Sequence, residues 1–190
     1  YDEGGITIYF GDCRDILPAL GKVDHAIFDP PYSAHVHDSN RRGLTAHAGE
    51  FSERRELGFD PLTSVLRDDV AALVGAQCDG WVVAFSDCES THLWRVSLTA
   101  CGLEYIRTGI WVKIGGAPQF TGDRPAVAFE EFVICHPKGK KGWNGGGKAG
   151  IYREVWEVPI VVSRGGKNDV RCHETQKPES LMRGIITDFT

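Results

Sequence analysis

The 190-residue sequence has no apolar run close to the ~18–20 residues that a membrane-spanning helix needs, and its start does not resemble a signal peptide. Its six cysteines include no Cys-x-x-Cys pair, and a disulfide framework is not expected in a chain this long with a normal core. At 42% hydrophobic and 25% charged residues, the composition excludes a chain that is disordered throughout. We therefore expect a soluble, intracellular protein of one domain spanning residues 1–190, with reduced and mostly buried thiols.

The net charge of −5 is unevenly distributed along the chain. Residues 138–153 contain five basic residues and no acidic one, so the rest of the chain is clearly acidic. A basic segment on an acidic body can contact a polyanion, because phosphate affinity depends on the local field rather than on total charge. A solvated loop has the same composition, so charge alone leaves both interpretations open.

The spacing of apolar residues predicts strands that alternate with helices. We expect strands at 6–10, 25–28, 81–85, 103–113 and 127–135, and helical segments at 15–20, 64–74, 93–101 and 178–189. This order predicts an α/β fold with a mostly parallel sheet and helices on both faces. Ligands of such folds bind beyond the carboxyl ends of the strands, and two polar clusters follow strands here, at residues 12–13 and 29–32.

The most specific motif is Asp29-Pro30-Pro31-Tyr32, which directly follows an apolar strand. Each proline fixes φ near −65° and lacks an N–H group, so the turn is stiff and its carbonyl groups point in set directions. Asp29 adds a carboxylate acceptor, and Tyr32 adds an aromatic plane beside it. The motif therefore predicts a pocket for a planar ring that carries an amino group. A proline-rich turn that merely ends a strand is the alternative.

Methylation of the exocyclic amine of a nucleobase requires such a pocket. The nitrogen lone pair is delocalised into the ring, so acceptors on both amino hydrogens would favour a pyramidal nitrogen and stabilise its developing positive charge. Asp29 and the Pro30 carbonyl are the candidate acceptors, and in-line transfer from a sulfonium donor then needs mainly positioning. A base inside a duplex cannot reach a pocket of this kind, so it must be flipped out and stacked, which we assign to Tyr32. The catalytic prediction thus comprises Asp29, Pro30, Pro31 and Tyr32.

Four stretches in this order resemble the β-class amino-methylating DNA methyltransferases of bacteria and phages. They are Gly11-Asp12-Cys13-Arg14-Asp15 with Leu17, Ala26-Ile27-Phe28-Asp29-Pro30-Pro31-Tyr32, Ile110-Trp111-Val112-Lys113, and His173-Glu174-Thr175-Gln176-Lys177-Pro178 with Leu181. Together they span nearly the whole chain. Asp29-Pro30-Pro31-Tyr32 and Gln176-Lys177-Pro178 are fairly specific for this family when they occur together, although each motif alone is weak evidence.

The resemblance implies a Rossmann-like fold that binds S-adenosylmethionine. Asp at position 29 is usual for adenine N6 methylation in this family, whereas Ser there goes with cytosine N4 methylation. By the same resemblance, Asp12, Cys13 and Asp29 would contact the cofactor, with Asp12 and the Cys13 backbone at its adenine. Gln176, Lys177 and Pro178 would line its methionine end. The family's glycine-rich cofactor loop follows the Lys-Pro helix and is not found before Thr190, so we expect a fold that is incomplete at the C-terminus and weak cofactor binding by these 190 residues alone.

The resemblance also implies double-stranded DNA as the partner, in a bacterial cell or a phage-infected host, with restriction-modification as one setting. It leaves a homodimer open. We predict a mobile loop at 33–60 that closes over the flipped base, and a basic loop at 138–153 that contacts phosphates. The predicted DNA-binding residues are Arg41, Arg42, Lys138, Lys140, Lys141 and Lys148.

Several weaker patterns in the sequence predict no function. Residues 145–150 match Gly-x-Gly-x-x-Gly, but the pattern needs a strand before it and a helix after it, and neither is expected here. His35 and His37 lack further ligands at metal-site spacing, so no metal is predicted. Trp81 and Trp111 are interpreted as core residues. Glu130 and Glu131 are interpreted as charges at a strand edge, without a role.

Three alternatives to an adenine-N6 DNA methyltransferase remain. The first is cytosine N4 as the methylated amine. The second keeps the pocket but acts on an amine in RNA or on a protein amide, for which relatives usually carry Asn at position 29. The third is a catalytically inactive nucleic-acid-binding partner.

Overall fold

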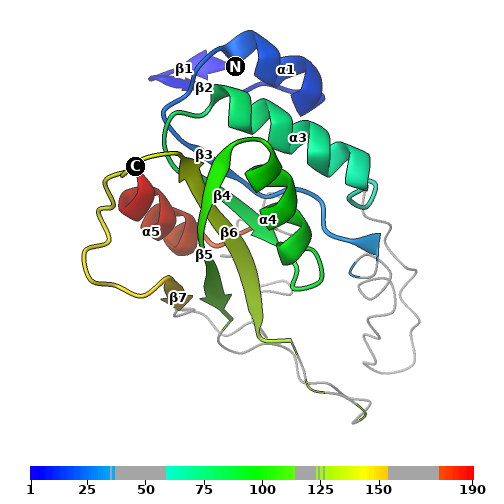
Figure 1. The fold of residues 1–190 in the computed structure, drawn as a ribbon, viewed down its shortest axis with the longest axis vertical. Helices are drawn as coiled ribbons and strands as arrows, with labels where there is room; N and C mark the ends of the chain where they lie inside the picture. The colour runs from blue at the N-terminus through cyan, green and yellow to red at the C-terminus, as the bar shows by residue number, and fades with distance from the viewer. Residues whose placement is uncertain (35, 37–58, 114–122, 124, 126, 154–175) are drawn as a thin grey trace, which may run out of the picture.

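The computed structural model describes residues 1–34, 36, 59–113, 123, 125, 127–153 and 176–190. The strands are β1 (Asp2–Glu3), β2 (Ile6–Thr7), β3 (Ala26–Phe28), β4 (Val82–Ser86), β5 (Leu103–Val112), β6 (Phe129–Pro137) and β7 (Ile151–Arg153). The helices are α1 (Cys13–Leu20), α3 (Ser64–Gln77), α4 (Thr91–Ala100) and α5 (Glu179–Phe189). Figure 1 shows them in their places.

Five strands form one sheet in the order β3-β4-β6-β5-β7. β3 runs parallel to β4 and β7 runs parallel to β5, whereas β6 is antiparallel to both of its neighbours. The predicted α/β order is therefore confirmed: β3, β4, β5 and β7 run in one direction, and β6 makes the sheet mixed by running against them.

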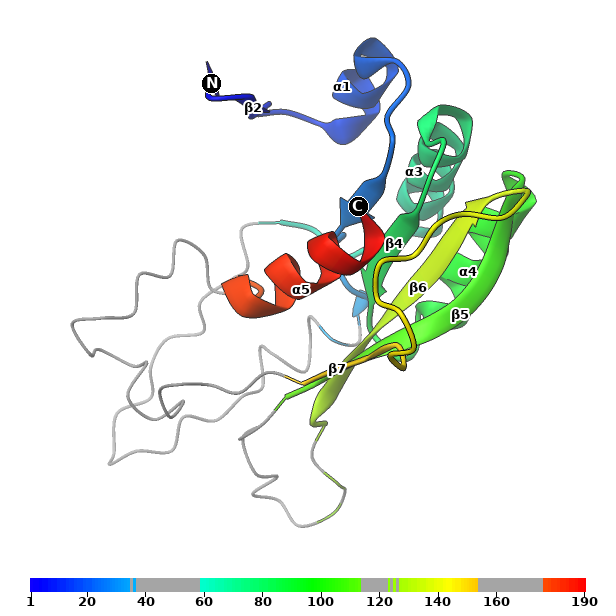
Figure 2. The ribbon, with the colours of Figure 1, turned by 90° about the vertical axis from the view of Figure 1, so that its left-hand side faces the viewer.

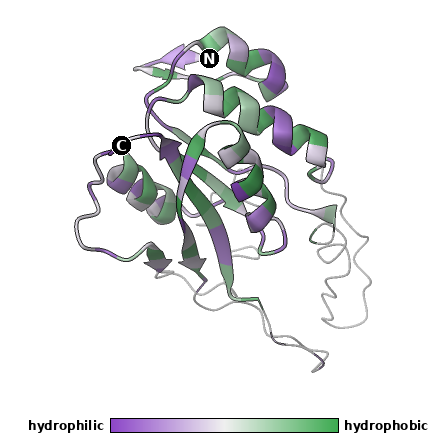
Figure 3. Ribbon diagram, viewed as in Figure 1, coloured by the Kyte–Doolittle hydropathy of each residue, from purple (hydrophilic) through white to green (hydrophobic). Residues whose placement is uncertain are grey.

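Helices cover both faces of this sheet, as predicted. α3 and α4 lie on one face and α5 lies on the other, as Figure 2 shows. β4 is buried along its whole length, which explains the continuous apolar run at 81–85. The hydropathy colouring of Figure 3 shows the apolar strands enclosed between these helices.

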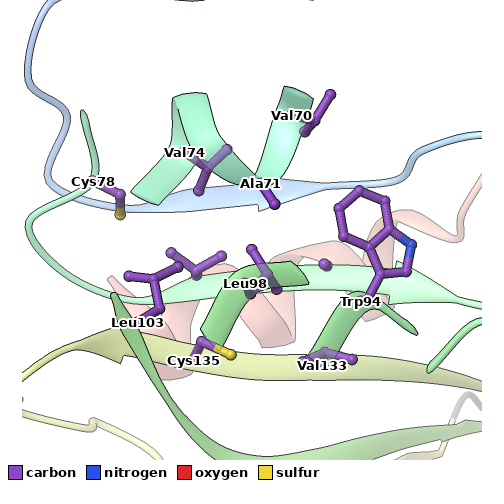
Figure 4. Packing of buried hydrophobic residues seen from close by; sticks show 11 residues of the cluster. Val70, Ala71, Val74, Cys78, Trp94, Leu98, Leu103, Val133 and Cys135 are labelled. Atoms are coloured by element: carbon purple, nitrogen blue, oxygen red, sulfur yellow. The ribbon is translucent and has the colours of Figure 1, made fainter. Parts of the chain in front are cut away.

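Each face of the sheet has its own apolar cluster. Under α3 and α4 the cluster includes the residues of Figure 4, such as Val74, Trp94 and Leu98, packed on Val133 and Cys135 of β6. The cluster under α5 joins Leu181, Ile185 and Phe189 to Val83, Phe85, Phe132, Ile134 and both predicted core tryptophans, Trp81 and Trp111. The second cluster packs α5 against β4, β5 and β6, which lie more than forty residues earlier in the sequence.

The expected first strand at 6–10 is only partly formed. β2 covers two residues, pairs only with β1 in a separate two-stranded sheet, and is exposed. Ile8, Tyr9 and Phe10 are exposed as well, because no other strand in the described part of the chain pairs with them.

The cysteines in the described segments are free thiols. Cys78 and Cys135 are buried and Cys101 is half-buried, but Cys13 and Cys88 are exposed, so the expectation that most thiols are buried holds only in part. Within the same segments, no helix is long and apolar enough to cross a membrane, and no three His, Cys, Asp or Glu side chains cluster as metal ligands would.

The contact of Gly109 on β5 with Phe132 on β6 gives a test of the sheet register. A Cβ atom added to Gly109 would lie 2.1 Å from the ring of Phe132, which is fully buried. Gly109→Ala is therefore expected to lower the free energy of unfolding by about 1–3 kcal/mol, measured by urea denaturation. Gly147→Ala is the matched control, since an added Cβ there meets no atom within 4 Å. Equal stability of the two variants would contradict the register.

Candidate functional site

Polar side chains gather at the edge of the sheet where β3, β4 and β5 end and β6 begins. Asp29 follows β3, Asp87 follows β4 and Lys113 follows β5, while Glu130 is the second residue of β6. β6 contributes its amino end because it runs antiparallel to its neighbours. This is the edge at which open α/β sheets bind ligands.

An ion pair joins the two most specific sequence motifs at this edge. Lys177 Nζ donates a hydrogen bond to Asp29 Oδ2 at 2.8 Å, across 148 positions of sequence. The Lys177 side chain is only 9% exposed, and that of Asp29 is 33% exposed. Burial raises the pKa of Asp29 above its ordinary value, and the Lys177 charge only partly opposes this shift. Asp29 is therefore paired, yet solvent still reaches it.

Glu130 is the second carboxylate on Lys177. Its Oε2 lies 3.1 Å from Lys177 Nζ, and its Oε1 forms an ion pair with Lys113. Its side chain is 15% exposed, and burial alone would raise its pKa; the charges of Lys177 and Lys113 outweigh burial, so its pKa is lowered. Two carboxylates and two ammonium groups thus form one neutral network.

The phenol of Tyr32 is held by the same network. Its hydroxyl donates a hydrogen bond to Glu130 Oε2 at 2.7 Å, and Lys177 Nζ lies 5.1 Å from the centre of its ring. Burial, with the charges of Glu130 and Asp29, raises the pKa of Tyr32, so the hydroxyl remains a donor. The ring is thereby fixed in orientation, with the lysine close to it.

Asp87 fixes the chain directly after Tyr32. Its Oδ2 accepts a hydrogen bond from the Ser33 backbone N–H at 2.8 Å, and its Oδ1 accepts one from the Ser90 N–H at 2.7 Å, at the start of α4. The Asp87 side chain is buried. The turn after β3 is thus tied to the end of β4.

A largely apolar cavity of about 470 Å³ borders the proline-rich turn. Asp29, Pro30 and Pro31 line one side of it, and Cys13 lines another. Its other walls are formed by α1, β3, α3, α4 and the segments that precede β3 and α3. The residues are Leu17, Val23, His25, Ala26, Ile27, Phe28, Leu62, Leu66, Val70, Val74 and Trp94. Tyr32 is not among the lining residues, so the predicted stacking face does not open into this cavity.

The two predicted cofactor contacts near the start of the chain have different surroundings. Cys13 lines the cavity, whereas Asp12 is the N-cap of α1 and binds Arg14. The hydrogen bonds from Arg14 lower the pKa of Asp12 to about 2, so it is a carboxylate that already has a cationic partner.

The Gln176-Lys177-Pro178 segment lies at the start of α5. Pro178 is the N-cap of that helix, which agrees with the expectation of a proline at its beginning. Gln176 is exposed. Lys177 lies between carboxylates, so its predicted contact with a cofactor remains a prediction.

The predicted basic loop lies mainly away from this edge. Lys141 Nζ donates to the backbone carbonyl of Asp79, before the amino end of β4, and Lys138 and Lys140 are its exposed neighbours. Lys148 forms an ion pair with buried Asp188 of α5 at 2.9 Å. The structure therefore does not bring these lysines together with Asp29. Arg41 and Arg42, most of the predicted loop at 33–60, and His35 and His37 lie outside the described residues.

Sequence reasoning missed Glu130, Lys113 and Asp87 as parts of this site. A signal for Glu130 was present: alternate residues of a strand share a face, and Glu130 shares one with the buried Phe132 and Ile134. An acid on a buried face needs a cationic partner, so its assignment as an edge charge was wrong. Glu131, its neighbour, points to the opposite face.

Comparison with known proteins finds similarity to methyltransferases, in sequence and in fold. No family model matches it. The type II methyltransferase M.HinfI of Haemophilus influenzae is 22% identical over 95% of this chain, and the chain spans about half (54%) of that relative's length. Among solved structures, the M1.HpyAVI–SAM complex matches 96% of this chain and 76% of its own length, with a TM-score of 0.63 and 19% identity.

A second structure of M1.HpyAVI agrees, with a TM-score of 0.59 and 20% identity over 96% of this chain and 74% of that one. The predicted fold class is thereby confirmed. The chain has the Rossmann-like α/β fold of M1.HpyAVI, and over nearly its whole length its sequence is similar to that of the type II methyltransferase M.HinfI.

Proposed function

We propose that this protein transfers a methyl group from S-adenosylmethionine to the N6 amine of a flipped-out adenine in double-stranded DNA. The observation that carries the proposal is the stiff Asp29-Pro30-Pro31 corner, which borders a cavity at the ligand-binding edge of the sheet. The similarity to M.HinfI and the fold shared with M1.HpyAVI, which was solved with SAM, support the reaction class.

Asp29 and the Pro30 carbonyl would accept the two amino hydrogens of the base. The prolines fix the backbone of this corner, so the two acceptors need little reorganisation when charge develops on the nitrogen. Asp29 is one-third exposed and bound through Oδ2 alone in the pair with Lys177, which leaves it accessible to an incoming amine. The proton can leave after the methyl group arrives, so Asp29 need not be a strong base.

The cavity fits part of a nucleoside-containing cofactor in size and chemistry. Its volume lies within the ~300–1,000 Å³ of ordinary ligand pockets, and its walls are mainly apolar, with Asp29, Cys13 and His25 as polar side chains. When bound, the cofactor supplies an electrophilic methyl group on a sulfonium. Cys13, Asp29 and the apolar side chain of Leu17 would hold it on this side, while Lys177 would approach it from the start of α5.

Tyr32 would hold the extruded base against the corner. Because its hydroxyl is fixed by Glu130, the ring presents a constant plane to a base entering from outside the cavity. Asp rather than Ser at position 29 favours adenine. The proposed contacts to DNA phosphates are Arg41, Arg42 and the basic residues of 138–153. Lys138 and Lys140 are exposed and so better placed for such contacts than Lys148, which already pairs with Asp188.

Replacing Asp29 tests the proposal directly. Full-length natural protein is incubated with labelled S-adenosylmethionine and duplex DNA, and the digested DNA is analysed for N6-methyladenine. Asp29→Asn is expected to lower kcat at least ~100-fold, since one acceptor in the transition state is lost, while DNA affinity changes little. Asp79→Asn, at an exposed Asp–Lys pair on the opposite edge, should methylate normally.

The products separate the alternatives. Formation of N4-methylcytosine would show that the methylated base is cytosine rather than adenine. Methylation of RNA or of a protein amide would show that the substrate is not DNA. DNA binding without transfer to any of these would indicate an inactive binding partner. Normal methylation by Asp29→Asn would refute the mechanism.

The environment of Asp29 predicts an acid limb in the pH profile of kcat/KM. Asp29 must be ionised to accept the amine hydrogen, and burial raises its pKa. Activity is therefore present above this raised pKa and lost as the pH falls through it, at a higher pH than an ordinary Asp would give. Steady-state rates across the acid range measure this limb. A limb at or below the ordinary Asp value would show that Asp29 is not the group that titrates.

A further inference from the structure

We infer that Glu130 is a positioning residue of this site: it shares the Lys177 ammonium group with Asp29 and fixes the hydroxyl of Tyr32. The inference deepens the proposed function and rests on it where activity is concerned. Its basis is a single oxygen, Glu130 Oε2, which contacts both Lys177 Nζ at 3.1 Å and the Tyr32 hydroxyl at 2.7 Å.

Lys177 has two carboxylate partners, and their balance decides how good an acceptor Asp29 is. A carboxylate bound by one ammonium group alone has much of its charge neutralised and accepts further hydrogen bonds less strongly. Glu130 shares the ammonium, so Asp29 keeps more negative charge for an amine. The Lys177 side chain is almost fully buried, which makes this competition strong because solvent does little to screen it.

Lys113 affects how Lys177 is shared between Asp29 and Glu130. It pairs with Glu130 Oε1, so it draws charge from the carboxylate that competes for Lys177. The charged and titratable groups around Asp29 in the described part of the chain are therefore Lys177 before α5, Glu130 on β6, Lys113 after β5, Asp87 after β4, and the Tyr32 phenol. This arrangement predicts opposite effects from removing Glu130 and removing Lys113.

Glu130→Gln keeps an oxygen that can accept from Tyr32 but removes the charge. Lys177 then pairs with Asp29 alone, so the pKa of Asp29 falls and the acid limb of kcat/KM moves to lower pH. At neutral pH kcat should fall about tenfold with KM for DNA little changed, because Asp29 is a weaker acceptor in the transition state. Lys113→Gln frees Glu130 to attract Lys177, so its acid limb should move to higher pH.

Glu131→Gln is the matched control. It is the same substitution on the next residue of β6, whose side chain points to the opposite face of the sheet. It should leave both kcat and the acid limb unchanged. General destabilisation could lower the activity of any variant, but it would not move the limb in opposite directions for Glu130→Gln and Lys113→Gln.

A second readout does not depend on catalysis. The Asp29 carboxyl is titrated by 13C NMR in the natural protein and in the three variants, with the signal assigned through Asp29→Asn. A pKa lowered in Glu130→Gln, raised in Lys113→Gln and unchanged in Glu131→Gln supports the inference, even if the protein methylates nothing and the proposed function fails. Equal Asp29 pKa values in Glu130→Gln and Glu131→Gln overturn it, whatever the activity.

Discussion

The ion pair between Lys177 and Asp29 is the interaction on which the rest of the site depends. It connects the segment before α5 to the turn after β3, and it does so at the sheet edge rather than in the core. Apolar packing of Leu181, Ile185 and Phe189 brings α5 onto the sheet but does not specify what its first turn contacts. The charge pair supplies that specificity, because a lysine that is 9% exposed needs a carboxylate within reach.

Burying charged groups costs desolvation free energy, and the arrangement of this network limits that cost. Two lysines and two carboxylates balance in charge, each lysine contacts Glu130, and the Tyr32 hydroxyl satisfies a further lone pair. A buried pair of this kind contributes little net stability compared with apolar residues, while loss of one member leaves an uncompensated charge. The network is thus better explained by the geometry it imposes on Asp29 and Tyr32 than by stability.

Much of the fold, and half of this site, could be predicted from the sequence. The helices at Ser64–Gln77 and Glu179–Phe189 and the buried strand at Val82–Ser86 follow from apolar spacing alone. The two motifs containing Asp29 and Lys177 were recognised, but their direct contact was not, because it joins positions 148 residues apart. Glu130 was missed because two adjacent acids look like edge charges until the face of each is known. The strand at 6–10 was overestimated, since β propensity needs a partner strand to act.

The direction of one strand explains both the site's composition and the position of the basic loop. β6 runs against β4 and β5, so it begins at the edge that holds Asp29 and ends at the opposite edge. Its first residues therefore deliver Glu130 to the site, and its last residue, Pro137, starts the lysine-rich loop at the other edge, where Lys141 binds the Asp79 carbonyl. Had β6 run parallel to its neighbours, the lysines would have followed it to the site and Glu130 would have been remote from it. The same reversal that supplies the positioning carboxylate thus separates the main basic segment from the candidate catalytic corner.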